Sequence, residues 1–279
     1  MKNALKVEIV NNNLCKRCTT EFPIVLVHGT GFRDYKYINY WGRIPKALEN
    51  EGAKVFYSKQ DAWGNIEDNA QTIKNSILEI LHNTGCKKVN LIAHSKGGLE
   101  ARYMICNLGM EECIASLTTI STPHHGSKTM DLFYNAPVFI FKTVAFFVNI
   151  YFRILGDKNP DFQTTCKQLS SIYCREFNEK NINSPNIYYQ SYASKMKSSF
   201  SDILLLVPHF ITNLIEGDND GLVQVDSAKW GDFKGIIKGK KLRGVSHADT
   251  VDLRRKNYSG IDIRDIYIDI VEDLKFKGF

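Results

Sequence analysis

The chain has 279 residues, of which 43% are hydrophobic and 24% are charged, and its formal net charge is +6. This length and composition are typical of one globular domain with an insertion, which buries a large core without disulfides or metals. The sequence contains no internal repeat and no low-complexity tract. No known nucleic-acid-binding motif accompanies the mild positive charge, so we expect no nucleic-acid partner.

The cysteines and the N-terminal residues indicate the cellular compartment of the protein. Seven cysteines are an odd number, and they lack the paired spacing of a disulfide framework. Cys15 and Cys18 form a single C-x-x-C without a second zinc-ligand pair, which indicates two reduced thiols in a turn. Met1–Val10 lacks the basic start and apolar run of a signal peptide. These features predict the cytoplasm, although a secreted chain whose leader had been removed would share them.

The first part of the chain alternates predicted strands and helices. Continuous apolar runs predict buried strands, and apolar residues at steps of three and four predict helices. The predicted elements are strand Pro23–Val27, a helix from about Tyr37 to near Gly52, strand Ala53–Ser58, a helix from about Trp63 that stops at Gly85, strand Lys88–Ala93, helix Leu99–Leu108 and strand Ile114–Ile120. This alternation predicts a mostly parallel sheet with helices on both faces.

The alternation of predicted strands and helices is interrupted between Ser127 and Asp161. Pro137–Leu155 is rich in Phe, Ile, Val and Tyr but is broken by Lys142, Asn149 and Arg153. A transmembrane helix needs about 20 largely uncharged residues, so we predict a surface segment rather than a membrane span. The fold is then expected to resume with helix Gln163–Phe177, strand Asn186–Tyr192 and helix Ile263–Leu274.

The strongest chemical motif lies between the strand Lys88–Ala93 and the helix that follows it. Its sequence is Ala93-His94-Ser95-Lys96-Gly97. Small residues at both ends let the chain turn sharply, so that the serine hydroxyl stands clear of the sheet. This pattern matches the G-x-S-x-G nucleophile elbow, with Ala93 in place of the first glycine. Ser95 is therefore the predicted nucleophile.

A serine hydroxyl needs a base within hydrogen-bonding reach, and in this type of fold the acid and then the histidine follow the serine. His247 is the better candidate for the base, because His209 ends an apolar run and is interpreted as structural. Asp220, ahead of Gly221 in a tight turn, is the better candidate for the acid. The alternative acids are Asp218 first, and then Asp226 and Asp232.

The tetrahedral intermediate also needs two hydrogen-bond donors, which are usually backbone N–H groups. One is expected from Lys96, the residue after the serine. The other is expected from Thr30, in the loop His28-Gly29-Thr30-Gly31 after the first core strand. We interpret His28 and His94 as structural residues that hold loops around the site.

Several motifs in order resemble the bacterial true lipases of the Pseudomonas and Burkholderia kind. Pro23–Gly29 is similar to the family's P-I-V-L-V-H-G segment, and Ala93–Gly98 to its A-H-S-x-G-G elbow. Ser121–Ser127 resembles the segment before the lid, and Asn219–Val223 the N-D-G-L-V that contains the acid. The resemblance therefore selects Asp220 over Asp218, and it extends from Pro23 nearly to the C-terminus.

The resemblance implies one α/β-hydrolase domain, with a core from about Phe22 and a helical lid inserted at Ser127–Asp161. It implies an acylglycerol or related ester as substrate, and a lid that opens at a lipid interface. The alternative is a fixed helical cap over a pocket for small esters. No cofactor is required for the chemistry.

The family often holds a structural calcium ion near the catalytic histidine. Asp249 matches one ligand position, and Asp202 is the candidate for an earlier ligand. Leu253, however, stands where the family has a glutamine ligand, and calcium prefers six to eight oxygen atoms. Asp226 stands where secreted relatives have a disulfide cysteine, which agrees with a reduced chain.

The sequence thus predicts a serine carboxylester hydrolase that acts on acylglycerols through an acyl-enzyme. The alternatives are a short-chain esterase, a phospholipase or an acyltransferase of the same fold, and, from a different class, a non-catalytic lipid-binding module. Basic residues cluster at Lys234–Lys241, Arg243 and Arg254–Lys256. This cluster is interpreted either as a solvated face or as a contact with anionic lipid.

Overall fold

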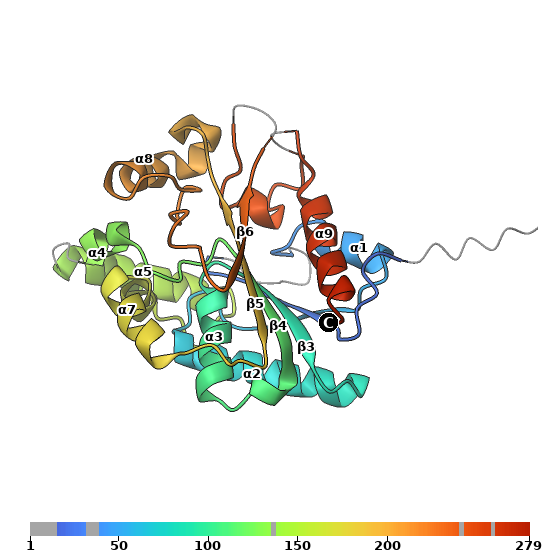
Figure 1. Cartoon of the computed structure of the whole chain (residues 1–279). Helices are drawn as coiled ribbons and strands as arrows, with labels where there is room; N and C mark the ends of the chain where they lie inside the picture. The colour runs from blue at the N-terminus through green and yellow to red at the C-terminus, as the bar shows by residue number, and fades with distance from the viewer. Residues whose placement is uncertain (1–15, 32–38, 135–137, 240–242, 258–259) are drawn as a thin grey trace, which may run out of the picture.

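The centre of the protein is a sheet of six parallel strands in the order β2-β1-β3-β4-β5-β6 (Figure 1). The computed structural model describes residues 16–31, 39–134, 138–239, 243–257 and 260–279. The strands are β1 (Ile24–Val27), β2 (Val55–Tyr57), β3 (Val89–His94), β4 (Ile114–Ile120), β5 (Tyr188–Ser194) and β6 (Asp232–Ile237). The predicted parallel α/β sheet is confirmed.

Helices lie on both sides of this sheet (Figure 1). They are α1 (Ile44–Asn50), α2 (Ile66–Thr84), α3 (Gly97–Asn107), α4 (Lys128–Tyr134), α5 (Val138–Ile154), α6 (Phe162–Gln168), α7 (Ser171–Lys180), α8 (Leu206–Ile215) and α9 (Ile263–Phe276). Short 3-10 helices add η1 (Glu111–Cys113), η2 (Ser199–Ser201), η3 (Ile203–Leu205) and η4 (Asp249–Val251).

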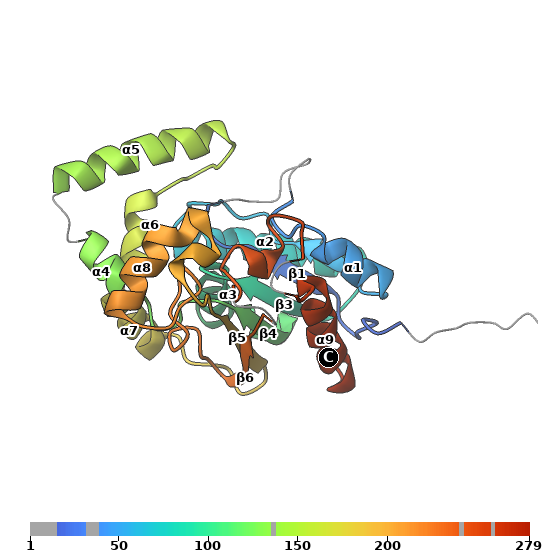
Figure 2. The same cartoon turned by 90° about the horizontal axis from the view of Figure 1, so that it is seen from above.

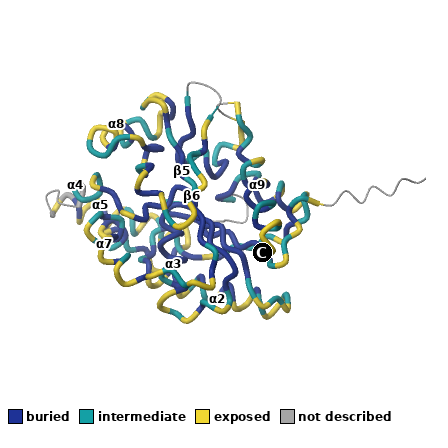
Figure 3. The backbone as a smooth tube through the Cα atoms, in the orientation of Figure 1, coloured by how far each residue is buried: buried dark blue, intermediate teal, exposed yellow. Residues whose placement is uncertain are grey.

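The central strands are buried along their whole length, because a helical layer covers each face of the sheet. In β1, Ile24 and Leu26 pack into the core formed with α1 and α9. Val25 and Val27 point the other way, into the core formed with α2 and α3. A strand between two layers needs apolar residues at successive positions, which explains the continuous apolar run in the sequence. Figure 3 shows these strands as a buried block.

Helix α2 follows the predicted spacing closely. The Asn65 side chain caps its first turn by accepting a hydrogen bond from the Asp68 N–H at 2.8 Å. Gly85 ends the helix with a φ of 70°, a left-handed conformation that favours glycine. Its apolar stripe of Ala70, Ile73 and Ile77 packs on the sheet.

Several predicted boundaries were wrong. The first described helix begins at Ile44 and does not include Trp41, because Gly42 has a φ of 54° and Arg43 is the N-cap residue. Tyr37, where the predicted helix starts, lies outside the described residues. The single helix predicted for Gln163–Phe177 is divided into α6 and α7, since Ser170 caps a new helix by accepting from the Tyr173 N–H. Strand β6 and helix α8 were not predicted.

The segment between β4 and α6 contains the apolar helix α5. Phe141 and Ala145 on one side of α5 are buried against Phe162 and Cys166 of α6. Its other side exposes apolar residues, namely Phe139, Phe146, Phe147, Ile150, Tyr151 and Ile154. In Figure 2, α5 lies at the edge of the molecule beside α6. No described helix is long and apolar enough to cross a membrane.

The described cysteines are all free thiols: Cys18, Cys86, Cys106, Cys113, Cys166 and Cys174. Cys18, the second cysteine of the C-x-x-C motif, is buried, whereas Cys15 lies outside the described residues.

Candidate active site

Ser95 occupies the sharp turn between β3 and α3. Its φ is +54°, a left-handed conformation that is rare for a non-glycine residue and that is found more often at active sites. The glycines that follow let α3 approach closely. A Cβ at Gly97 would lie 2.4 Å from His28 O, and a Cβ at Gly98 would lie 2.3 Å from Thr122 Oγ1. The motif therefore folds into the strand, turn and helix of a nucleophile elbow.

The loop after β1 lies directly against this turn. A Cβ at Gly29 would come within 2.6 Å of Ser95 Cβ, so only glycine fits there. Thr30, one of the two predicted oxyanion donors, lines the same cavity as Ser95. The other predicted donor, Lys96, is the N-cap residue of α3. The fold thus brings the loop of Thr30 to the turn that contains Ser95 and Lys96.

Asp220 and His247 come from two loops and form a hydrogen-bonded pair. His247 Nδ1 lies 2.9 Å from Asp220 Oδ2, and the His247 backbone N–H donates to Asp220 O at 2.8 Å. The buried carboxylate also accepts from Ser194 Oγ at 2.9 Å and from the Val223 N–H at 2.9 Å. Burial raises the pKa of Asp220, but the His247 ring and the hydrogen bond from the Val223 N–H outweigh this effect and hold the pKa at about 2.

The ionised carboxylate fixes the tautomer of the imidazole. Because Asp220 accepts from His247 Nδ1–H, Nε2 is the nitrogen that can take up a proton. The ring of His94 lies 4.4 Å from that of His247, centroid to centroid. Since His94 directly precedes Ser95, this contact places His247 next to the elbow.

The competing candidates pair with other residues. His209 is buried, and its Nδ1 lies 2.8 Å from Ser199 Oγ. The other candidate carboxylates pair as follows: Asp218 with Lys195 Nζ, Asp226 with Lys229 Nζ, and Asp232 with Tyr188 Oη. Among the four candidate acids, Asp220 is therefore the one that meets His247.

His94 links His247 to the rest of the fold through hydrogen bonds. Its Nδ1 lies 2.7 Å from Tyr40 Oη, and its Nε2 lies 2.9 Å from Thr250 Oγ1. Thr250 Oγ1 in turn donates to His247 O at 2.7 Å, so it accepts from His94 Nε2–H. Burial and the nearby His247 lower the pKa of His94 well below its ordinary value. A neutral His94 with its proton on Nε2 satisfies all these contacts.

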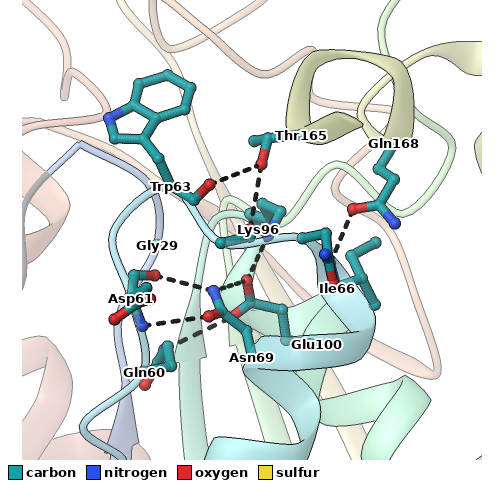
Figure 4. A network of polar contacts seen from close by, with 12 residues as sticks. Gly29, Gln60, Asp61, Trp63, Ile66, Asn69, Lys96, Glu100, Thr165 and Gln168 are labelled. Atoms are coloured by element: carbon teal, nitrogen blue, oxygen red, sulfur yellow. Dashed lines mark hydrogen bonds and ion pairs between the residues drawn. The ribbon is translucent and has the colours of Figure 1, made fainter. Parts of the chain in front are cut away.

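The Lys96 side chain has a second role that the sequence analysis missed. Its Nζ is buried and contacts Glu100 Oε1 at 2.5 Å and Gly64 O at 2.6 Å (Figure 4). Asn69 Nδ2 also donates to Glu100 Oε1, at 2.7 Å. Gln60 Nε2 donates to His28 O at 2.9 Å, which joins the loop after β1 to the network. The sequence signal for this network was a lysine and a glutamate four residues apart, directly after Ser95.

This network also reaches the segment that follows α5. Thr165 Oγ1 donates to Gly64 O at 3.1 Å (Figure 4). The Asp161 N–H donates to Trp63 O at 2.7 Å. The Asp157 carboxylate accepts from the Trp63 N–H at 3.0 Å. The loop of Trp63 is therefore held between the elbow and the end of the inserted segment.

Ser95 opens into a cavity of about 370 Å³. The wall is mostly apolar and comes from the loop of Trp63, the inserted segment and α8. Its apolar lining residues include Trp63, Met130, Phe162, Leu169, Val207 and Ile211. A pocket of this size and polarity suits an apolar ligand that is oriented by a few polar groups at one end.

The two predicted calcium ligands lie near each other but do not fit a metal ion. Arg254 Nη2 contacts Asp202 Oδ1 at 2.6 Å, and Arg243 Nη1 is paired with Asp249 Oδ2. A cation would have to displace these guanidinium groups. Within the described ranges, no group of three or more His, Cys, Asp and Glu residues could hold a metal.

Comparison with known proteins agrees with this architecture. Residues 23–202 match the sequence model of the palmitoyl protein thioesterase family. Triacylglycerol lipase 2 of Saccharomyces cerevisiae is 30% identical over 270 residues, which cover 88% of this chain and 78% of that protein. A triacylglycerol lipase of Burkholderia plantarii is 30% identical over 177 residues, covering 60% of this chain and 49% of the relative. The matched stretch thus spans about half of the bacterial lipase.

Solved structures agree on the fold. A Bacillus licheniformis lipase in its mature form has a TM-score of 0.66 with 21% identity, covering 89% of this chain and 91% of that chain. The parallel sheet, the flanking helices and these similarities define an α/β-hydrolase fold. The chain belongs to the palmitoyl protein thioesterase family, as a lipase-like member of the α/β-hydrolases.

Proposed function

We propose that the chain is a serine carboxylester hydrolase of the lipase type, with Ser95 as nucleophile, His247 as base and Asp220 as acid. The observation on which this depends is the Asp220–His247 pair, 2.9 Å long, beside the strained turn of Ser95. Ser95 lines an apolar cavity, and the ring of His247 lies against His94, the residue that precedes Ser95. A structural role alone gives no reason for a left-handed serine at this position.

The mechanism follows from these positions. Ser95 Oγ attacks the ester carbonyl while His247 Nε2 takes its proton, and Asp220 stabilises the imidazolium that forms. The backbone N–H groups of Thr30 and Lys96 hold the oxyanion, and each is worth about 10²–10³ in rate. His247 then protonates the departing alcohol. Water releases the acid from the acyl-enzyme by the reverse sequence.

The cavity supports a long apolar acyl group as the part of the substrate that is recognised. Its wall is formed mainly by apolar side chains, so the acyl chain would be held by burial rather than by hydrogen bonds. An acylglycerol is the proposed substrate, and the yeast relative is named a triacylglycerol lipase. We also propose that the chain resembles the Pseudomonas and Burkholderia lipases in its substrate specificity.

The inserted helices are proposed to act as a lid. The outer side of α5 exposes Phe146 by 61% and Phe147 by 64%, which is unusual for a helix in contact with water alone. Its inner side packs on Phe162 of α6, which lines the cavity. We propose that α5 moves when this surface contacts lipid, which opens the way to Ser95.

A second candidate function is the hydrolysis of long-chain acyl thioesters. The match to the palmitoyl protein thioesterase model favours it. The same three residues would perform the reaction, and only the leaving group differs. Parallel assays with emulsified triacylglycerol, dissolved short-chain esters, phospholipid vesicles and a palmitoyl thioester would separate these substrates. Transfer of the acyl group to an added alcohol would reveal an acyltransferase.

The decisive experiment is labelling with a fluorophosphonate probe. We expect labelling of the native chain and none of the Ser95→Ala variant, together with a loss of turnover by about 10⁴–10⁶ without unfolding. Ser127 lines the same cavity, so Ser127→Ala is the matched control and should still be labelled. An unlabelled native chain would indicate a non-catalytic lipid-binding module, and normal activity of Ser95→Ala would exclude the serine mechanism.

A further inference from the structure

Two arginines and two aspartates form a compact cluster behind the loop of His247. Arg254 contacts Asp202 Oδ1 at 2.6 Å and Asp249 Oδ1 at 3.4 Å. Arg243 is paired with Asp249 Oδ2 and lies 3.8 Å from Asp202 Oδ2. Each guanidinium thus bridges both carboxylates, and the four formal charges cancel. The Asp202 side chain is fully buried, and that of Asp249 is 8% exposed.

Both carboxylates also hold the residue that precedes His247. Ser246 Oγ donates to Asp202 Oδ2 at 2.7 Å, and the Ser246 N–H donates to Asp249 Oδ2 at 3.0 Å. The Asp249 N–H returns a hydrogen bond to Ser246 O at 3.0 Å. The backbone before His247 is therefore fixed by these two carboxylates, and the backbone after it is tied to Ser246 by the Asp249 N–H.

Two buried carboxylates this close repel each other unless positive charge lies between them. A divalent cation would supply it through oxygen ligands. Here the oxygen atoms instead accept hydrogen bonds from guanidinium groups, whose planar fork suits carboxylates. The positive charge that stabilises this loop is therefore part of the chain itself.

We propose that Arg243 and Arg254 are positioning residues that take the place of a metal ion and hold His247 toward Asp220. This inference rests on the proposed function, because His247 acts there as the base. The arginines touch neither substrate nor Ser95 in this role. They act through Asp202, Asp249 and Ser246 on the orientation of the imidazole.

The proposal predicts that the native enzyme needs no divalent metal. Activity on a dissolved ester should be unchanged by EDTA and by added calcium, and calorimetric titration with calcium should show no stoichiometric binding. Arg254→Gln and Arg243→Gln should each lower kcat on the order of 10- to 100-fold with little change in KM, as is typical for groups that orient a catalytic ligand. Arg254→Lys should retain part of the activity.

A readout independent of turnover is the low-field proton NMR resonance of His247 Nδ1–H, shared with Asp220. It should broaden or shift in Arg254→Gln and persist in Arg254→Lys. Arg17→Gln is the matched control, since Arg17 also bridges two carboxylates, Asp269 and Glu272, far from the site. It should leave kcat and the resonance unchanged.

Loss of native activity in EDTA that calcium restores would overturn the proposal. So would glutamine variants with native kcat and a native resonance. The metal measurements use the unmodified chain and stay decisive even if a variant does not fold. A native chain that the fluorophosphonate probe does not label would instead reject the proposed function itself.

Discussion

His94 and His247 lie ring against ring, with centroids 4.4 Å apart, although 153 positions of sequence separate them. The contact joins the residue before the nucleophile to the proposed base. It is compatible with catalysis because His94 stays neutral: burial is the main cause of its lowered pKa, and the neighbouring His247 adds to it. A charged His94 would repel the imidazolium that forms on His247 during the reaction.

Stability should decrease below about pH 6.5. Burial lowers the pKa of both His94 and His124 well below the ordinary value, so in acid the unfolded chain takes up protons that the folded chain does not. The stabilisation is complete above about pH 6.5 and is lost as the pH falls, by up to about 1.4 kcal/mol per pH unit for each histidine.

Urea unfolding at pH 7.5, 6 and 5 measures this change in the free energy of unfolding. His124→Asn should reduce the slope, whereas substitution of the exposed His82 should not. A free energy of unfolding that stays constant over this range would contradict the expectation.

Asp220→Asn should lower kcat by about 10⁴, since an amide no longer fixes the Nδ1–H tautomer or stabilises the imidazolium. The carboxyl has a pKa of about 2, so Asp220 itself is ionised across the working pH range. Steady-state kinetics on a dissolved ester measures the effect. Asp218→Asn, which alters a surface pair with Lys195, should leave kcat within a factor of two or so. Similar losses in both variants would argue against Asp220 as the acid.

The buried Lys96–Glu100 pair should show strong coupling in a double-mutant cycle. Lys96→Met leaves a buried carboxylate and Glu100→Gln leaves a buried ammonium, and each should cost about 3–5 kcal/mol in the free energy of unfolding. The double variant removes both charges and keeps an amide for Asn69, so it should recover much of that loss. Chemical denaturation of the four proteins gives the coupling energy. Additive losses would show that the pair is not energetically linked.

Ile211→Trp should shift the preference toward short acyl chains. Ile211 lines the cavity, so an indole there would occupy space that a long chain needs. The ratio of kcat/KM for a long-chain over a short-chain ester is expected to fall about tenfold or more, as for a few methylene groups excluded from an apolar pocket. Leu214→Trp is the control, because Leu214 lies on the same helix but is 70% exposed. An unchanged ratio in Ile211→Trp would mean that the acyl chain binds elsewhere.

Replacement of Phe146 and Phe147 by serine should lower activity on emulsified triacylglycerol severalfold and spare dissolved short-chain esters. The reason is that these rings are exposed on α5 and would be buried only against lipid. Phe276→Ser removes a ring that is even more exposed, at 80%, from the far helix α9 and should affect neither substrate. Equal losses on both substrates would favour a fixed cap over a moving lid.

Local sequence was sufficient for the central strands and for the turn that contains Ser95. The apolar run of Pro23–Val27 and the strand Ile114–Ile120 lie within one or two residues of β1 and β4. The elbow of Ser95 could be predicted because its small residues are required by a turn between adjacent elements. Strand β6 was missed because Asp232–Ile237 is only partly buried and lacks a continuous apolar run.

The partners of each charged side chain were decided only by the tertiary structure. The sequence placed Arg243 and Arg254 in a basic cluster and Asp202 and Asp249 at a calcium site, whereas the fold pairs the arginines with those aspartates. It likewise buries the Lys96 side chain against Glu100. The spacing of apolar residues along the chain predicts which face of a helix or strand is buried, because the direction of each side chain depends only on its position within that element. The pairing of charges depends on distances between distant segments, and these exist only once the sheet has brought their loops together.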